Sequence, residues 1–306
     1  MSWTIDQIRV CVDGLQRSVG DERRDTVDWV ALGALIARVA HHSHSDWAQT
    51  RRWSRELAEI VGTPRTSTTF CQMFRRVLTG GGWSRGEAAV AARPAPRLPW
   101  LVLVAGLNGI RKTTAVNSSW FSAALLASNA AAFNDGVSAE VVSDPPCGER
   151  GFFRQLDFMI ATLASEEFRK LYANFGAHDV DAYARRKSEI FSQYRTMAEI
   201  LGVLLVDEAL GAGMDVFAET SGRSASSFSY VDFLAATREG AEGTRTTTIA
   251  ATGPVARKLV VRFDVSDVSH AERSVAVRMQ REIAEGQRAL ERGDHDDLLL
   301  ANRGGA

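Results

Sequence analysis

The sequence predicts an α/β fold in which a three-layer parallel sheet, covered by helices, follows an N-terminal helical region. Three observations predict it. Apolar residues before position 78 recur at helical spacing, short apolar runs after position 100 alternate with helical segments, and a glycine-rich turn joins the first of these runs to a helix. Strands and helices in alternation are typical of a parallel sheet with helices on its faces.

The composition is that of a folded globular protein with balanced charge. The 306 residues are 45% hydrophobic and 24% charged, with a formal net charge of -1, which argues against disorder and gives no overall attraction to nucleic acid or an acidic membrane. The three cysteines are too scattered for a disulfide framework or a metal site, which favours a reducing compartment. No run reaches the ~18 apolar residues of a membrane span. We therefore expect a cytoplasmic protein that binds neither nucleic acid nor membrane.

The N-terminal region, residues 1–78, is predicted to be helical because apolar residues such as Leu32, Leu35 and Val39 are three or four positions apart. Three glycines at 80–82 and three prolines before position 100 then predict a linker over 79–99. The second domain would cover 100–306. The helical region could dock a protein partner or cover the substrate of the second domain, and the sequence leaves both open.

The second domain is predicted to contain four strands. The first, at 101–105, is an uninterrupted apolar run, as expected for a strand buried on both faces. The others are expected at 139–142, 214–218 and 258–263. Helices are predicted at 112–132 and, with a break near Gly176, at 154–211, and a loop rich in glycine and threonine at 238–252.

The turn after the first strand matches a phosphate-binding loop, or P-loop, of the form GxxxxGK[ST]. Such a loop needs a preceding strand, backbone N–H groups that face the phosphates, a lysine for the β- and γ-phosphates and a hydroxyl for Mg²⁺. Lys112 is one of only four lysines among 36 basic residues, so its presence here is informative. Thr113 would hold the Mg²⁺ of bound ATP. The residues predicted to bind the nucleotide are Gly106, Asn108, Gly109, Ile110, Arg111, Lys112, Thr113 and Thr114.

One position departs from the motif. Arg111 stands where the last glycine belongs, at a point where the backbone normally approaches phosphate closely and a side chain would crowd it. We expect nucleotide binding to tolerate this residue and phosphoryl transfer to be slowed by it.

A second polar cluster follows the third predicted strand. Glu219, Thr220 and Arg223 lie where that strand ends, and ligands of open α/β sheets bind at the carboxyl ends of the strands. These residues are predicted to bind a substrate. The alternative is a capped turn with a structural ion pair between Glu219 and Arg223.

The two motifs together resemble those of the zeta-toxin group of P-loop kinases, over roughly residues 101–287. The resemblance implies a general base just after the second strand, most simply Asp144, with Asp157 as the second candidate. It also implies arginines on a helix after the fourth strand, where Arg273 and Arg278 are available and Arg278 is the one expected to reach the phosphoryl group. The run 152–158 lies outside the motifs of that group.

These features lead to a hypothesis of an ATP- and Mg²⁺-dependent kinase that phosphorylates a hydroxyl of a small molecule. The main alternative is a nucleotide-binding regulatory or assembly protein with little catalysis. A third is an NTPase, since 203–208 match the letters of a Walker B strand (four apolar residues, then Asp and Glu), although their place in a predicted helix favours a structural role. The histidines at 41, 42 and 44 have no accompanying ligands at metal spacing and are expected to be a solvated helix end.

Overall fold

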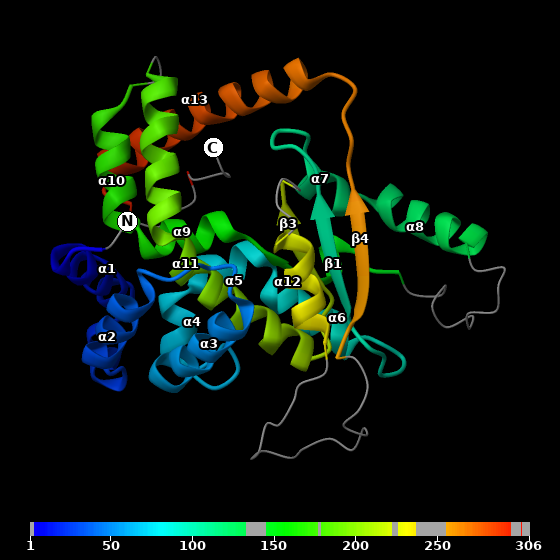
Figure 1. The fold of residues 1–306 in the computed structure, drawn as a ribbon, viewed down its shortest axis with the longest axis horizontal. Coiled ribbons are helices and arrows are strands. Elements are labelled where there is room, and N and C mark those ends of the chain that lie inside the picture. The colour runs from blue at the N-terminus through cyan, green and yellow to red at the C-terminus, as the bar shows by residue number, and fades with distance from the viewer. Residues whose placement is uncertain are drawn as a thin grey trace.

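The chain begins with helices and continues with strands and helices in alternation (Figure 1). The structure, a computed structural model, describes residues 3–132, 145–176, 179–221, 226–236 and 255–294, together with Ala301. The N-terminal helices are α1 (Ile5–Ser18), η1 (Asp21–Thr26), α2 (Trp29–Val39), α3 (Trp47–Val61), α4 (Thr68–Met73), α5 (Arg75–Gly81) and α6 (Trp83–Ala91). They are followed by β1 (Trp100–Ala105), α7 (Lys112–Val116), α8 (Ser119–Ala132), η3 (Gly148–Arg150), β2 (Phe152–Arg154), α9 (Leu156–Leu163), α10 (Ser165–Asn174), α11 (Val180–Gly211), β3 (Val216–Thr220), α12 (Ser226–Ala235), β4 (Arg257–Arg262) and α13 (Val268–Arg292).

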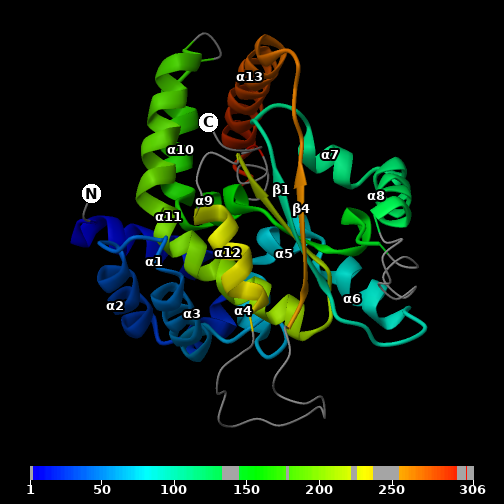
Figure 2. The ribbon, with the colours of Figure 1, turned by 45° about the vertical axis from the view of Figure 1, so that its right-hand side comes forward.

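The sheet has the order β2-β3-β1-β4 in the described part of the chain, and every pair of strands is parallel. β1 is central, with Ala105 in register with Thr220 of β3 and Arg262 of β4, so three strands end at the same edge. An all-parallel sheet needs a cover on both faces. Figure 2 shows α11 and α12 on one side of β1 and β4, and α7 and α8 on the other.

Side chains of β1 alternate between these two faces. Leu101 and Leu103 belong to the large core shared with α9, α11 and α12. Val102 and Val104 point the other way, into a smaller cluster with Val116 of α7 and with Phe121, Phe153 and Phe217. The continuous apolar run of β1 is therefore used on both faces, which confirms an α/β fold with a parallel sheet.

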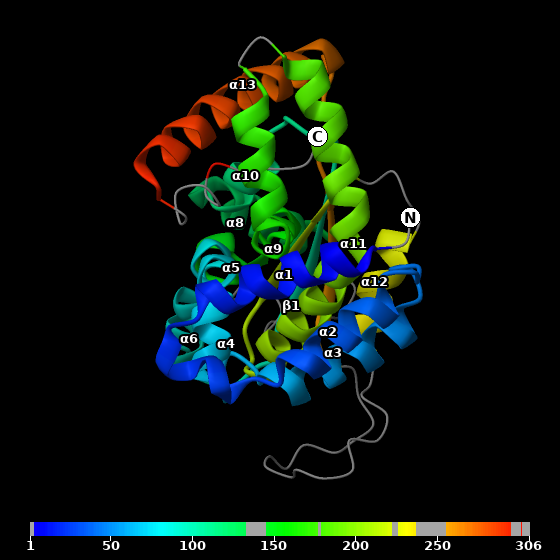
Figure 3. The ribbon, with the colours of Figure 1, turned by 90° about the vertical axis from the view of Figure 1, so that its left-hand side faces the viewer.

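The N-terminal helices share the large core rather than forming one of their own. Buried residues from Trp3 to Val77 belong to the same cluster as those of α9, α11 and β3. The Trp3 indole donates a hydrogen bond of 3.0 Å to the Gln193 carbonyl of α11. Figure 3 shows the N-terminal helices against α9, α10 and α11. No helix in the described ranges is both long and apolar enough to cross a membrane.

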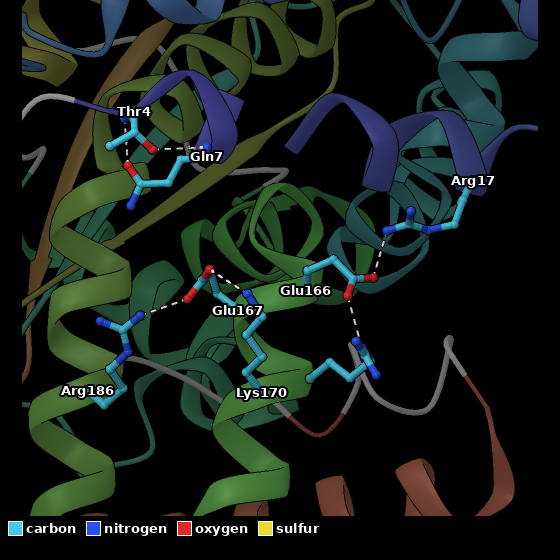
Figure 4. Close-up of polar contacts among 8 residues, drawn as sticks. Thr4, Gln7, Arg17, Glu166, Glu167, Lys170 and Arg186 are labelled. Atoms are coloured by element: carbon cyan, nitrogen blue, oxygen red, sulfur yellow. Dashed lines mark hydrogen bonds and ion pairs between the residues drawn. The ribbon is translucent and has the colours of Figure 1, made fainter. Parts of the chain in front are cut away.

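Exposed ion pairs join three of these helices at the surface (Figure 4). Glu166 of α10 accepts from Arg17 of α1 at 2.7 Å, and the neighbouring Glu167 accepts from Arg186 of α11 at 2.7 Å. Thr4 caps the first turn of α1 in a reciprocal capping box with Gln7. Exposed pairs contribute at most about 1 kcal/mol each, so burial of the apolar faces holds these helices together.

The linker predicted over 79–99 is wrong for most of its length. Residues 75–91 form α5 and α6, and Gly81 lets α5 approach the sheet, since a Cβ there would lie 2.6 Å from the Phe152 ring. The segment that follows is also fixed. Arg97 donates two hydrogen bonds of 2.8 and 2.7 Å to Asp215, and Arg93 pairs with the same carboxylate at 3.2 Å. Composition alone does not distinguish a flexible linker from a segment whose glycines permit close packing and whose arginines bind a buried acid.

Three of the four predicted strands are present, with ends that differ slightly from the predicted ones. β1, β3 and β4 lie within two residues of their expected positions, whereas the strand expected at 139–142 and the loop expected at 238–252 fall outside the described residues. β2 was not predicted, because three residues are too short to show a period. Residues 203–208 lie inside α11, and Asp207 binds Arg51 at 3.0 and 3.1 Å. The Walker B interpretation is therefore wrong.

Candidate functional site

The loop between β1 and α7 leaves the sheet between the ends of β3 and β4. The Gly106 amide donates to the Thr220 carbonyl at 3.2 Å, and the Phe263 amide donates to the Ala105 carbonyl at 2.8 Å. At the tip of the loop, Gly109 has a φ of 87° and a Cβ on it would lie 2.5 Å from the Ala271 carbonyl of α13. The first turns of α13 therefore pack against the loop, above the edge of the sheet (Figure 1).

Arg111 adopts the left-handed conformation that favours glycine, with φ 61° and ψ 37°. In the described part of the chain it is the one residue other than glycine with a positive φ. The conformation costs an L-residue roughly 1 kcal/mol or more. The backbone at Arg111 thus has the conformation that glycine would adopt there, and the Arg111 side chain is exposed to solvent.

Lys112, the first residue of α7, is folded back into the loop. Its ammonium group donates to the Gly106 and Leu107 carbonyls at 2.8 and 2.9 Å and lies 3.0 Å from Glu219 Oε1. The Thr113 hydroxyl donates to the other carboxylate oxygen of Glu219 at 2.8 Å. Lys112 is 2% exposed and Glu219 is 32% exposed, so the cluster has a buried cation and a carboxylate that reaches solvent.

The remaining loop residues supply backbone groups rather than side-chain contacts. Asn108 and Ile110 are half-buried and Thr114 is exposed. The amides of Asn108, Gly109 and Arg111 donate no hydrogen bond to any residue that the structure describes. A loop with open N–H groups next to a lysine and a threonine hydroxyl has the donors that a phosphate group requires.

Some of the other residues predicted for the site lie beside the loop, and others do not. Glu219 and Thr220 lie beside the loop, at the end of β3, whereas Arg223 and Asp144 fall outside the described residues. Arg273 is exposed and pairs with Asp267 at 3.5 Å on the surface. Arg278 is half-buried on α13 and acts electrostatically on Asp157.

Asp157 lies on the first turn of α9, directly after β2, at the carboxyl edge of the sheet. Burial raises the pKa of Asp157; Lys187 opposes this effect and Glu219 adds to it, followed by Arg278, which opposes it, and Glu282, which adds to it. Acids with perturbed pKa values are concentrated at functional sites, although structural networks also perturb them. Of the two carboxylates that the sequence offered as bases, Asp157 is the one within the described ranges.

A buried ionic network lies on the other side of Glu219. Arg154, the last residue of β2, binds Glu199 of α11, and Arg195 donates to the same carboxylate at 2.8 Å. Although burial opposes it, the charges of Arg154 and Arg195 hold the pKa of Glu199 below its usual value. The sequence does not predict this network. Its one available signal was the run 152–158, which contains both Arg154 and Asp157.

The fold and the cluster define an α/β protein with a polar site at the carboxyl edge of a parallel sheet. Comparison with protein-family models, with curated protein sequences and with solved structures finds no match to the chain. The residues of the site themselves therefore carry the evidence for a function.

Proposed function

We propose that residues 106–114 form a P-loop that binds ATP with Mg²⁺, and that the protein transfers the γ-phosphoryl group to a hydroxyl of a small molecule. The observation that carries this proposal is the cluster of Lys112, Thr113 and Glu219. It brings together a cation for the β- and γ-phosphates, a hydroxyl and a carboxylate, all beside a loop with open amides.

The oxygen atoms of this cluster fit Mg²⁺. Thr113 Oγ1 and Glu219 Oε2 are 2.8 Å apart, close to the separation of about 3 Å between adjacent ligands of an octahedral Mg²⁺. Mg²⁺ keeps several water molecules and takes oxygens from phosphate, so a cage of protein ligands is not required. We therefore propose that Glu219 serves the nucleotide and metal side of the site, rather than the acceptor side to which the sequence analysis assigned it.

Phosphoryl transfer depends mainly on positioning and charge stabilisation, and these residues would supply both. Lys112 would exchange its loop carbonyls for phosphate oxygens, and Arg278 would stabilise the charge of the transferred group. Asp157 would accept the proton of the acceptor hydroxyl. A base works best when its pKa lies near the operating pH, and burial raises the pKa of Asp157 in that direction. Asp144 remains the second candidate for this role.

The first test is ATP binding by calorimetry, with and without Mg²⁺. Lys112→Ala should weaken binding by about tenfold or more, equivalent to roughly 1.4 kcal/mol, because it removes the cation that faces the phosphates. Lys258→Ala, on the exposed surface of β4, is the matched control. Equal ATP affinity in wild type and a folded Lys112→Ala variant would rule out the P-loop.

The second test measures transfer of label from γ-labelled ATP to a mixture of metabolites. If Asp157 is the base, Asp157→Asn should keep its ATP affinity and lose on the order of 10² to 10⁴ in rate, whereas Asp144→Asn should retain activity. The reverse result would assign the base to Asp144. Tight ATP binding without transfer by any form of the protein would favour the nucleotide-binding regulator instead of the kinase.

A further inference from the structure

A small cavity lies beside Glu219, on the side away from Lys112 and towards the N-terminal helices. Its volume is about 40 Å³, enough for roughly three water-sized groups. The sheet contributes Leu103, Ala218, Glu219 and Thr220. The rest of its wall comes from β2, α11, α12 and the N-terminal region, with the lining residues Arg154, Arg195, Glu199, Tyr230, His44 and Trp47.

Three residues of this wall have polar hydrogens that lack a partner in the described part of the chain. They are the Trp47 indole N–H, the Arg154 Nε–H and the Tyr230 hydroxyl. The Trp47 and Tyr230 rings meet edge to face at 4.7 Å, and the Arg154 guanidinium lies over the Tyr230 ring at 4.9 Å. Tyr230 is 3% exposed and Arg154 is 5% exposed. Buried donors are nearly always satisfied in folded proteins, so three around one cavity require an explanation.

The charges of the wall favour a ligand with a negative charge. Arg154 and Arg195 share the single carboxylate of Glu199, and the charge of Glu219 is matched by Lys112. At the wall itself two guanidinium groups therefore share one carboxylate, and Asp157 is the further acid whose charge acts on Arg154. The pKa of His44 agrees with this balance, because burial and then the charge of Arg195 lower it. His44 is half-buried here and is not part of the solvated helix end that the sequence predicted.

We propose that this cavity binds the carboxylate of the phosphoryl acceptor, so that the substrate is a small hydroxy acid whose hydroxyl faces the site at Glu219; this rests on the proposed kinase function. A carboxylate has three heavy atoms and only accepts hydrogen bonds, which suits the size of the cavity and its donors. His44 and Trp47 form part of the wall. The N-terminal helical region is then part of the substrate site.

A wider groove adjoins this cavity on the side of the N-terminal helices. It has a volume of about 550 Å³ and lies between the turn after α2 and the middle of α11. The groove and the cavity share His44 and Arg195, which stand between them. The remainder of a larger hydroxy acid would lie in this groove.

The test uses glycerate as the charged probe and glycerol as the neutral one, both without ATP. Binding is followed by calorimetry and by the indole N–H signal of Trp47 in nuclear magnetic resonance, assigned by its loss in Trp47→Phe. Glycerate should shift this signal and glycerol should not. Tyr230→Phe should weaken glycerate binding by about tenfold or more at unchanged thermal stability, because its hydroxyl has no partner to lose in the described part of the chain.

Tyr183→Phe is the matched control, since the hydroxyl of Tyr183, on α11, donates to the buried Glu282 of α13, and neither residue lines the cavity. It should lower stability and leave glycerate binding unchanged. No shift with glycerate, an equal shift with glycerol, or full affinity in both Tyr230→Phe and Trp47→Phe would overturn the inference. ATP calorimetry on the same samples separates the two proposals: ATP binding without glycerate binding removes only the hydroxy acid, and glycerate binding without ATP binding removes only the kinase.

Discussion

Two of the four lysines are buried against glutamates, and their surroundings differ. Lys187 of α11 lies 2.8 and 2.9 Å from the two oxygens of Glu282 on α13, and both residues are fully buried. The hydroxyls of Tyr183 and Tyr172 point to the same carboxylate. Lys112 lies 3.0 Å from a carboxylate that is one-third exposed, and its other partners are carbonyls of a loop.

The difference shows which pair can serve a ligand. Among the described residues, the partners of the Lys112 ammonium lie at the edge of the sheet, where a phosphate oxygen could replace a carbonyl at little cost. Glu282 is enclosed by helices α10, α11 and α13, and removing one charge would leave the other in the interior. Burial of a lysine therefore does not identify a site by itself; the exposure of its partner separates the two cases.

The largest expected effect comes from breaking the buried pair. Lys187→Met should lower the free energy of unfolding by about 3 to 5 kcal/mol, because Glu282 would remain as an uncompensated buried charge. The double variant Lys187→Met with Glu282→Leu should regain most of this loss. Chemical denaturation measures both. Lys170→Met is the control, since Lys170 is exposed and pairs with Glu167 at 3.6 Å, and it should cost less than about 1 kcal/mol.

The same substitution at the sheet edge should cost less. Lys112→Met removes two hydrogen bonds to carbonyls, but water can reach Glu219 once the lysine is gone, so we expect a loss of about 1 to 2 kcal/mol. Denaturation under the conditions used for Lys187→Met gives the comparison directly. A loss as large as that of Lys187→Met would mean that the Lys112 pair is structural as well.

The third prediction concerns pH. The folded protein holds the proton of Asp157 to a higher pH than the unfolded chain, whose value is near 3.8, so this group lowers stability as pH rises from that value through the raised pKa. Asn cannot ionise. Asp157→Asn should therefore become more stable relative to wild type as pH increases from about 4 towards neutrality. Denaturation at several pH values tests this, with the exposed Asp181→Asn as control. A stability difference that is constant with pH would contradict a raised pKa.

The smallest expected change is at Arg111. Arg111→Gly relieves the left-handed strain but adds freedom to the unfolded chain, so stability should rise by no more than about 1 kcal/mol. If Arg111 crowds the phosphates, turnover should increase in this variant. Thermal melts and the label-transfer assay give the two answers. Lower turnover would instead make Arg111 a cation that takes part in transfer.

The sequence predicted the parts of the fold that depend on local pattern. The apolar run of β1 and the glycine turn before Lys112 have short-range signatures, and both lie where they were expected. The sequence did not predict β2, and it predicted a linker where α5 and α6 lie; both errors have a physical reason. Three residues carry no period, and whether glycine and arginine are loose or packed depends on distant partners, here Phe152 and Asp215.

The side of the candidate site at Lys112 was predictable from the sequence, and the side at the cavity was not. Lys112 and Thr113 belong to one motif, and Glu219 follows a recognisable strand. Trp47, Arg154 and Tyr230 come from three separate segments, and only the folded chain brings them to one cavity. From sequence, Asp157 is the second candidate for the base, because its neighbours look like packing residues. The sequence does not show that a strand, residues 152–154, ends just before it.

The position of α13 has a consequence for how the chain is completed as it is made. Glu282 follows Lys187 by 95 positions, and Ala271, which contacts the loop at Gly109, is on the same helix. Contacts between segments so far apart form late, because the intervening chain must first be ordered. When α11 leaves the ribosome, Glu282, the buried partner of Lys187, has not yet been synthesised. Docking of α13 would then finish the helical region and the loop in a single step, so that no partly made chain exposes a finished site.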